Sequence, residues 1–146
     1  MPRLVHLLRK LSLAYVDAMS TLAMGAGLHQ TDLRALIELL DAEREGRRLG
    51  AGDLGRALGM TTQATTALVK RLERAGLVTR RRSRSDGRRV DLLVSPRALD
   101  IGWRHFGDLV AVLSEAIGGL DDAGRATVEQ LLEHALKGLE ELTTTR

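Results

Sequence analysis

A chain of 146 residues fits one domain of ordinary size, and aromatic residues make up only 2% of it, so an aliphatic core and a mainly helical chain are expected rather than a β-sandwich. The absence of cysteine excludes disulfides, thiol-based redox sensing and thiolate zinc sites. The net charge is +3, but residues 70–89 hold nine basic residues against two acidic ones, which leaves +7 on this segment and −4 on the rest of the chain. Such a local positive field indicates a polyanionic partner, although a solvated basic face is the alternative.

Two helices are predicted in the first third of the chain. Apolar residues recur at three- and four-residue spacing from Leu4 to Leu22, which predicts an amphipathic helix that ends at Gly25. A second helix is expected to start with Thr31 as its N-cap and to pass through Leu40, before a loop over residues 46–52. No uninterrupted apolar run has the length of a signal peptide or a membrane span, so a cytoplasmic protein is expected.

A short helix, a tight turn and a longer helix are predicted next. Asp53 starts the short helix, and Gly59 ends it as a C-cap. Thr61 or Thr62 caps the longer helix, which ends at Gly76. The side chains expected on the buried side of the longer helix are Ala64, Leu68, Leu72 and Ala75, and those expected on the opposite side are Thr62, Gln63, Thr65, Thr66 and Lys70.

A basic β-hairpin and two long helices complete the predicted order. Residues 77–79 supply a short strand that leads into the basic run at residues 80–84, residues 85–87 form the turn, and residues 90–94 return as the second strand. Ser95-Pro96 starts a long helix that breaks at Gly118, and Asp121 or Asp122 caps the last helix. This order predicts a mainly α fold with a small β-hairpin wing, that is, a winged helix-turn-helix flanked by N- and C-terminal helices.

The polar face of the longer helix has the chemistry for reading base edges. Threonine methyl groups suit contact with thymine, and Gln63 can pair bidentately with adenine. An ordinary polar helix face is the alternative, which three β-branched residues disfavour slightly. The hairpin arginines would neutralise phosphates or enter the minor groove. The candidate DNA-binding residues are Thr61, Thr62, Gln63, Thr65, Thr66, Lys70, Arg71, Arg80, Arg82, Arg84, Arg88 and Arg89.

These segments resemble the MarR (multiple antibiotic resistance regulator) family of transcription factors. The clearest match is Arg-Leu-Glu-Arg-Ala-Gly-Leu-Val at residues 71–78, followed by Asp-x-Arg at Asp86 and Arg88. The motif resemblance covers about residues 50 to 95, and the helix layout extends it to nearly the whole chain. It implies a homodimer whose terminal helices intertwine, an ion pair from Asp86 that braces the wing, and an Arg88 side chain that reaches the minor groove.

The resemblance also assigns domains and a candidate effector pocket. Residues 28–95 would form the DNA-binding region, and residues 1–27 and 96–146 the helical dimerisation region, within one compact domain. Leu-rich stripes at both ends of the chain agree with pairing, although intramolecular packing of the two helices is the alternative. Small lipophilic or phenolic effectors of the family would bind beside Tyr15, Met19, Leu22, His29, Trp103 and Phe106, each of which could instead be a core residue.

An enzyme is not predicted, because no nucleophile with a base and no clustered carboxylates are found. The four histidines are dispersed and none has a partner at i, i+4, so neither a metal nor a cofactor is expected. The sequence therefore predicts a homodimeric, sequence-specific regulator of transcription, most simply a repressor that an effector releases from double-stranded DNA with a pseudo-palindromic site. The alternatives are a winged helix used for protein contacts and a DNA-compacting protein without sequence preference.

Overall fold

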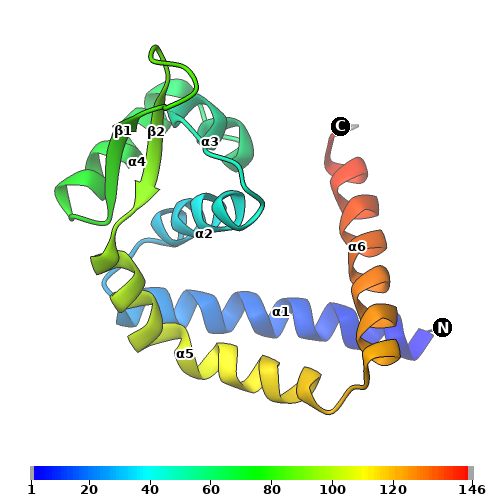
Figure 1. Ribbon diagram of the computed structural model, residues 1–146. Helices are drawn as coiled ribbons and strands as arrows, with labels where there is room; N and C mark the ends of the chain where they lie inside the picture. Colours follow the sequence, from blue (N-terminus) through cyan, green and yellow to red (C-terminus); the bar gives the residue numbers. More distant parts are fainter. Residues whose placement is uncertain (1, 145–146) are drawn as a thin grey trace. The chain divides into compact units, whose positions relative to one another are not determined.

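The computed structural model describes residues 2–144 and has the predicted order of elements (Figure 1). The ends of the predicted domain ranges, residues 1, 145 and 146, lie outside the described residues. The elements are α1 (Pro2–Gly25), α2 (Gln30–Arg44), α3 (Ala51–Leu58), α4 (Thr62–Arg74), β1 (Val78–Arg82), β2 (Val90–Val94), α5 (Pro96–Gly118) and α6 (Asp122–Thr144). The fold is thus mainly α with one antiparallel hairpin, as predicted.

The chain divides into two compact units within α5. Residues 1–107 form the first unit, which holds α1 to β2 and the start of α5, and residues 108–146 form the second. The predicted division into a DNA-binding region and a dimerisation region stays a prediction.

The starts of α2 and α3 were predicted wrongly, by a common cause. α2 begins at Gln30 with His29 as its N-cap, and α3 begins at Ala51 with Gly50 as its N-cap. In both helices an aspartate three residues after the N-cap reaches back, so that a carboxylate oxygen accepts from the N-cap backbone N–H at 3.1 Å in α2 and 2.9 Å in α3. These aspartates therefore cap their helices from inside the first turn.

The other helix ends follow the prediction. The side chains of Thr61, Ser95 and Asp121 accept from the backbone N–H three residues ahead, at 3.2, 3.2 and 2.8 Å. Gly59, with φ of 65°, ends α3, and Gly76, with φ of 71°, follows the end of α4. Both glycines take the left-handed conformation that other residues rarely adopt, so each allows the sharp reversal after its helix.

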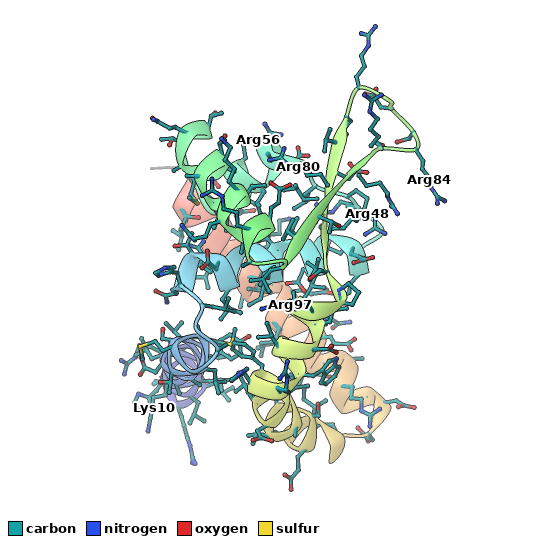
Figure 2. The ribbon with its side chains drawn as sticks, turned by 90° about the vertical axis from the view of Figure 1, so that its left-hand side faces the viewer. Lys10, Arg48, Arg56, Arg80, Arg84 and Arg97 are labelled. Atoms are coloured by element: carbon teal, nitrogen blue, oxygen red, sulfur yellow. The ribbon has the colours of Figure 1, made fainter. Side chains whose placement is uncertain are left out.

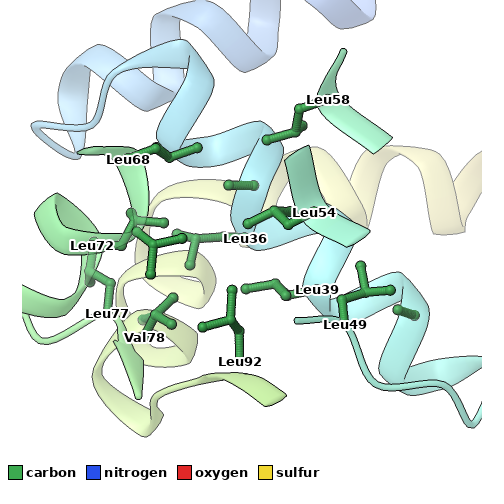
Figure 3. Packing of buried hydrophobic residues seen from close by; sticks show 14 residues of the cluster. Leu36, Leu39, Leu49, Leu54, Leu58, Leu68, Leu72, Leu77, Val78 and Leu92 are labelled. Carbon is green, nitrogen blue, oxygen red and sulfur yellow. The ribbon is translucent and has the colours of Figure 1, made fainter. Parts of the chain in front are cut away.

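One aliphatic core holds α2, α3, α4 and the hairpin together (Figure 3). It contains no aromatic side chain, as the composition indicates. Burial of each of its larger side chains stabilises the fold by about 1.5–3 kcal/mol. Its members are Ala35, Leu36, Leu39, Ala42, Leu49, Leu54, Leu58, Leu68, Val69, Leu72, Leu77, Val78, Leu92 and Ala98.

The hairpin is fixed to this core at its base. β1 pairs with β2 from Val78 opposite Val94 to Arg82 opposite Val90. The backbone N–H of Leu92 donates to the carbonyl of Leu49 at 2.8 Å, which ties β2 to the loop before α3. The wing therefore extends from a rigid base, while its tip lies in solvent.

The long helices contrast with this core, because their large apolar side chains are mostly exposed. In α1 only Ala23 is buried, in α5 only Ala98, and in the described part of α6 none. No single helix within residues 2–144 is long and apolar enough to cross a membrane, and α1 and α2 pass that test only as a pair bent by 107°. The exposed large apolar residues of these helices are Leu4, Val5, Leu7, Leu11, Leu13, Tyr15, Val16, Met24, Leu99, Trp103, Val110, Val112, Ile117, Leu131, Leu132, Leu136, Leu139 and Leu142.

Candidate nucleic-acid interface

Gly55 and Thr65 fix the packing of α3 against α4. A Cβ atom added to Gly55 would lie 2.6 Å from Thr65 Oγ1, so only glycine permits this approach. Thr65 is 2% exposed, and its hydroxyl donates to the carbonyl of Thr61 at 2.8 Å. The prediction that Thr65 lies on the exposed face is therefore wrong, since its side chain fills the contact between the two helices.

The buried stripe of α4 agrees with the predicted one at Leu68 and Leu72 and differs from it at the other two positions. Its members are Thr65, Leu68, Val69 and Leu72, whereas Ala64 and Ala75 are not among the buried residues. This stripe follows the spacing i, i+3, i+4, i+7. The exposed face of α4 includes Thr62, Gln63, Thr66, Ala67 and Lys70.

Thr66 presents its methyl group on this face. Its hydroxyl donates to the carbonyl of Thr62 at 2.8 Å, so Oγ1 turns back to the helix. Ala67 adds a second methyl group, and it lies on the same face as Gln63 because the two residues are four positions apart in the helix. Ala67 was not among the predicted residues. This surface of methyl groups and one amide matches the features that distinguish thymine and adenine in the major groove.

Arg71 forms an ion pair within the protein, unlike its neighbour Lys70. Its Nε and Nη2 atoms both donate to Asp32 Oδ1, at 2.9 and 2.5 Å. Asp32 is 4% exposed and lies in the first turn of α2. The pair therefore joins α4 to the start of α2. Lys70 is exposed and makes no ion pair within the described part of the chain.

The arginines of the wing fall into two groups. Arg80 pairs with Glu73 of α4 at 2.8 Å, and Arg89 pairs with Asp53 at 2.8 Å and Asp91 at 3.2 Å. Within residues 2–144, the side chains of Arg81, Arg82, Arg84 and Arg88 make no ion pair, and Arg84 points away from the helices at the tip (Figure 2). Arg80, opposite Leu92 in the middle of the hairpin, and Arg89, just before β2, are thus held by acidic side chains. The free guanidinium groups lie on the outer part of β1 and in the turn.

The wing is braced by Arg89 rather than by an ion pair of Asp86, which was the expected brace. Asp86 Oδ1 accepts from the backbone N–H of Arg88 at 3.0 Å, which forms a local turn at the tip. Arg89 instead reaches across to α3 through Asp53, and its Nη2 also donates to the carbonyl of Arg48. Arg89 is therefore largely occupied in holding the wing against the helix-turn-helix.

Asp53 is the centre of this brace. Its Oδ2 accepts from the backbone N–H of Gly50 and from Arg89, and its Oδ1 accepts from Arg56 at 2.6 Å. The Gly50 hydrogen bond, with the charges of Arg89 and Arg56, holds the pKa of Asp53 below the ordinary carboxyl value of 3.8, although burial opposes this shift. Arg56, an exposed cation on α3, was not among the predicted residues (Figure 2).

The residues of the predicted effector pocket lie on α1, α5 and the corner between α1 and α2. Trp103 is 70% exposed and Tyr15 is 41% exposed, whereas Met19, Leu22 and Phe106 are half-buried. His29 is exposed at the start of α2. The last turn of α1 lies against α5 at Gly25 and His105. A Cβ atom added to Gly25 would lie 3.9 Å from the imidazole Nδ1 of His105.

No group of three His, Asp or Glu side chains within residues 2–144 is placed to hold a metal ion. The geometry instead combines a short helix, a tight turn, a longer helix with a free polar face, and a basic hairpin held at its base. This combination defines a winged helix-turn-helix.

Comparison with known proteins identifies the family. Residues 26–89 match the model of the MarR family. YcgE, an HTH-type transcriptional regulator of Bacillus subtilis (strain 168), is 38% identical over 112 residues, which cover 77% of this chain and 68% of YcgE. The chain belongs to the MarR family of transcriptional regulators, and it is a regulator rather than an enzyme.

Solved structures share the fold at lower identity. A mutant of MepR from a multidrug-resistant clinical isolate of S. aureus has a TM-score of 0.73 and 17% identity, over 92% of this chain and 96% of that one. MepR in complex with DNA has a TM-score of 0.62 and 17% identity, over 92% and 95% of the two chains. MepR bound to ethidium bromide has a TM-score of 0.61, with the same identity and coverage. At this identity the likeness establishes the winged helix-turn-helix fold.

Proposed function

We propose that two copies of this chain form a homodimer that binds a pseudo-palindromic site in double-stranded DNA and represses transcription until a small lipophilic or phenolic effector releases it. The observation that supports this most strongly is the exposed, uncharged face of α4 beside a wing whose outer arginines have no acidic partner among the described residues. Membership of a family of transcriptional regulators and the solved complex of MepR with DNA agree with it.

The face of α4 favours specific over non-specific binding. Thr62, Gln63, Thr66 and Ala67 hold no charge, so they add little to attraction for phosphate and can distinguish bases. A protein that only compacts DNA needs cations on the surface that meets the groove. The neutral face flanked by cations therefore separates base contact from phosphate contact.

The wing supplies the phosphate contacts. Arg82, Arg84 and Arg88 are exposed near the end of the hairpin, and pairing with DNA phosphates costs them no intramolecular ion pair. The brace through Arg89 holds the hairpin against α3 at the start of β2. The tip would then reach the backbone or minor groove next to the site that α4 enters.

A second copy of the chain is the partner that best fits the long helices. Their exposed leucines and valines cannot all stay in water without promoting aggregation, and the core of the winged helix-turn-helix is already complete without them. Closed two-fold pairing would bury the same stripe in both copies. It would also place two reading helices in the symmetric arrangement that a pseudo-palindromic site requires.

An effector would act on the same helices. Trp103 and Tyr15 expose large rings on α5 and α1, and Met19 and Leu22 add flexible apolar surface close to Tyr15 in sequence. The solved complex of MepR with ethidium bromide, a planar aromatic cation, supports a flat aromatic ligand for a protein of this fold. Trp103 is the only tryptophan, so quenching of its fluorescence by phenolic or planar cationic compounds would report binding, with Trp103→Phe as the control.

Selection from a pool of random DNA duplexes tests the proposed function. The proposal predicts enrichment of a two-fold related motif, with half-sites about one helical turn apart and affinity that falls steeply with salt. No enrichment above the starting pool, with salt-sensitive binding to every duplex, would instead support a DNA-compacting protein. No DNA binding at all would support a protein-contact module.

A further inference from the structure

An ion pair between the buried Asp32 and the half-exposed Arg71 joins the reading helix to the corner between α1 and α2. The two oxygens of Asp32 have different partners, since Oδ2 accepts from the backbone N–H of His29 while Oδ1 accepts from Nε and Nη2 of Arg71. One carboxylate therefore contacts the N-cap of α2 and a side chain of α4. At 4% exposure it is also shielded from water.

This pair is costly to break by removal of Arg71, because Asp32 is the buried partner. A buried carboxylate that loses its cation keeps its desolvation penalty, and removal of Arg71 leaves Asp32 with the His29 N–H as its remaining donor. Two nitrogen atoms of Arg71 donate hydrogen bonds to Asp32. The preceding residue, Lys70, is exposed and makes no ion pair among the described residues. Two adjacent cations of α4 thus differ in their surroundings.

The corner that Asp32 caps is short and well defined. Leu28 N–H donates to the carbonyl of Ala23 at 2.9 Å, and Gly27 has φ of 70°, so α1 turns into α2 within four residues. A displacement of the end of α1 must move His29 and hence its hydrogen bond to Asp32. The same carboxylate then transmits the displacement to Arg71 on α4.

We infer that Arg71 is a positioning residue, not a phosphate contact, and that the Asp32–Arg71 pair sets the placement of the reading helix relative to the α1–α2 corner. The role in DNA binding rests on the proposed function. The pair itself does not, because it exists in the free chain. A change at α1, whether from dimerisation or from an effector, reaches the DNA-binding face through this pair.

The test compares Arg71→Met, Asp32→Asn, the double variant and the control Lys70→Met, which removes an adjacent exposed charge. Affinity for the selected duplex is measured over a salt series. Arg71→Met and Asp32→Asn should each weaken binding roughly tenfold, and the double variant should be no weaker than Arg71→Met, as expected for coupled residues. For these three variants, the slope of log affinity against log salt concentration should equal that of the unmodified chain. Lys70→Met should instead lower this slope by about one for each phosphate that Lys70 neutralises.

Amide hydrogen exchange of the free proteins gives a readout that needs no DNA. Arg71→Met should speed exchange both at the start of α2 and in α4, and Lys70→Met should not. Arg71→Lys, which keeps the charge, covers the case in which Arg71→Met does not fold, and it should show a smaller change at the same two places.

Two outcomes would overturn the inference. One is a lower salt slope for Arg71→Met together with unchanged affinity for Asp32→Asn, because Arg71 would then contact phosphate. The other is unchanged exchange at α2 in every Arg71 variant, because the pair would then transmit nothing. Failure of the unmodified chain to bind any duplex would refute the proposed function, while the exchange result would still decide whether the pair couples the two helices.

Discussion

Asp53 shows how much one side chain contributes to the position of the wing. It caps α3, pairs with Arg56 and anchors Arg89, so the start of α3 and the position of the wing depend on the same carboxylate. Its lowered pKa means that the folded state favours the charged form. The resulting stabilisation is present above the ordinary value near 3.8 and is lost as the pH falls through the lowered pKa of the folded state.

Asp53→Asn should therefore lower the free energy of unfolding by about 1–2 kcal/mol at neutral pH, because a charged acceptor is replaced by a neutral one. Urea unfolding at a series of pH values measures the difference between the two proteins. This difference should be constant above about pH 4 and should shrink below it, since the Asp53 carboxyl becomes protonated first in the unfolded chain and, at lower pH, in the folded one. A difference that stays constant down to about pH 2 would show that the charge of Asp53 does not stabilise the fold.

Gly55 gives a second prediction at the scale of the residue. Glycine to alanine within a helix normally stabilises by up to about 1 kcal/mol. Gly55→Ala should instead destabilise by about 1–3 kcal/mol, because the new methyl group would collide with Thr65. Gly52→Ala is the matched control in the same helix, since its methyl group would meet only the end of the Arg56 side chain at 3.7 Å. Thermal unfolding compares them, and equal shifts for both variants would contradict the predicted collision.

The sequence identified the right segment for DNA contact but could not assign each residue within it. Gln63, Thr66 and Lys70 are exposed as predicted, whereas Thr65 is buried. A threonine fits either face of a helix, and its burial here depends on the gap that Gly55 leaves on a different helix. Arg71 and Arg89 likewise differ from their neighbours only because of distant acids, 39 and 36 residues away in the chain.

At the scale of the element, helix α4 and the wing should have different effects on binding. Gln63→Ala should change the preferred base at one position of each half-site, at a cost of about 1–3 kcal/mol for the original base. Arg88→Ala should weaken binding to all duplexes and lower the salt slope by about one for each phosphate that Arg88 neutralises. Titrations of a set of single-base variants of the site, at two salt concentrations, separate the two effects. Uniform weakening for Gln63→Ala would exclude it from base reading.

The limits of the elements were predictable where a single residue determines them. Thr61, Ser95 and Asp121 cap their helices from the expected position, and β2 has the expected bounds. The starts of α2 and α3 were placed too late, because an aspartate can cap either as the N-cap itself or from inside the first turn. Local sequence does not distinguish these two arrangements.

At the scale of the whole molecule, the proposed homodimer depends on the exposed apolar faces of the long helices. Leu136→Glu should convert the proposed dimer to monomer, because a buried, unpaired carboxylate at the interface costs more than the contact contributes. Val90→Glu introduces the same charge at an exposed apolar residue of the wing and should leave the dimer intact. Sedimentation velocity distinguishes them, and a dimer that persists in Leu136→Glu would place the interface elsewhere.

The proposed function requires that the two winged helix-turn-helix regions of the dimer bind two half-sites at a fixed distance from each other. The most direct test inserts about five base pairs, half a helical turn, between the half-sites of the selected duplex, and compares it with a duplex in which as many central base pairs are replaced at the same spacing. We expect the insertion to lower affinity to that of a single half-site, at least about tenfold, while the replacement has a much smaller effect. Equal affinity for the inserted and original duplexes would contradict this requirement, because the two regions would then bind independently.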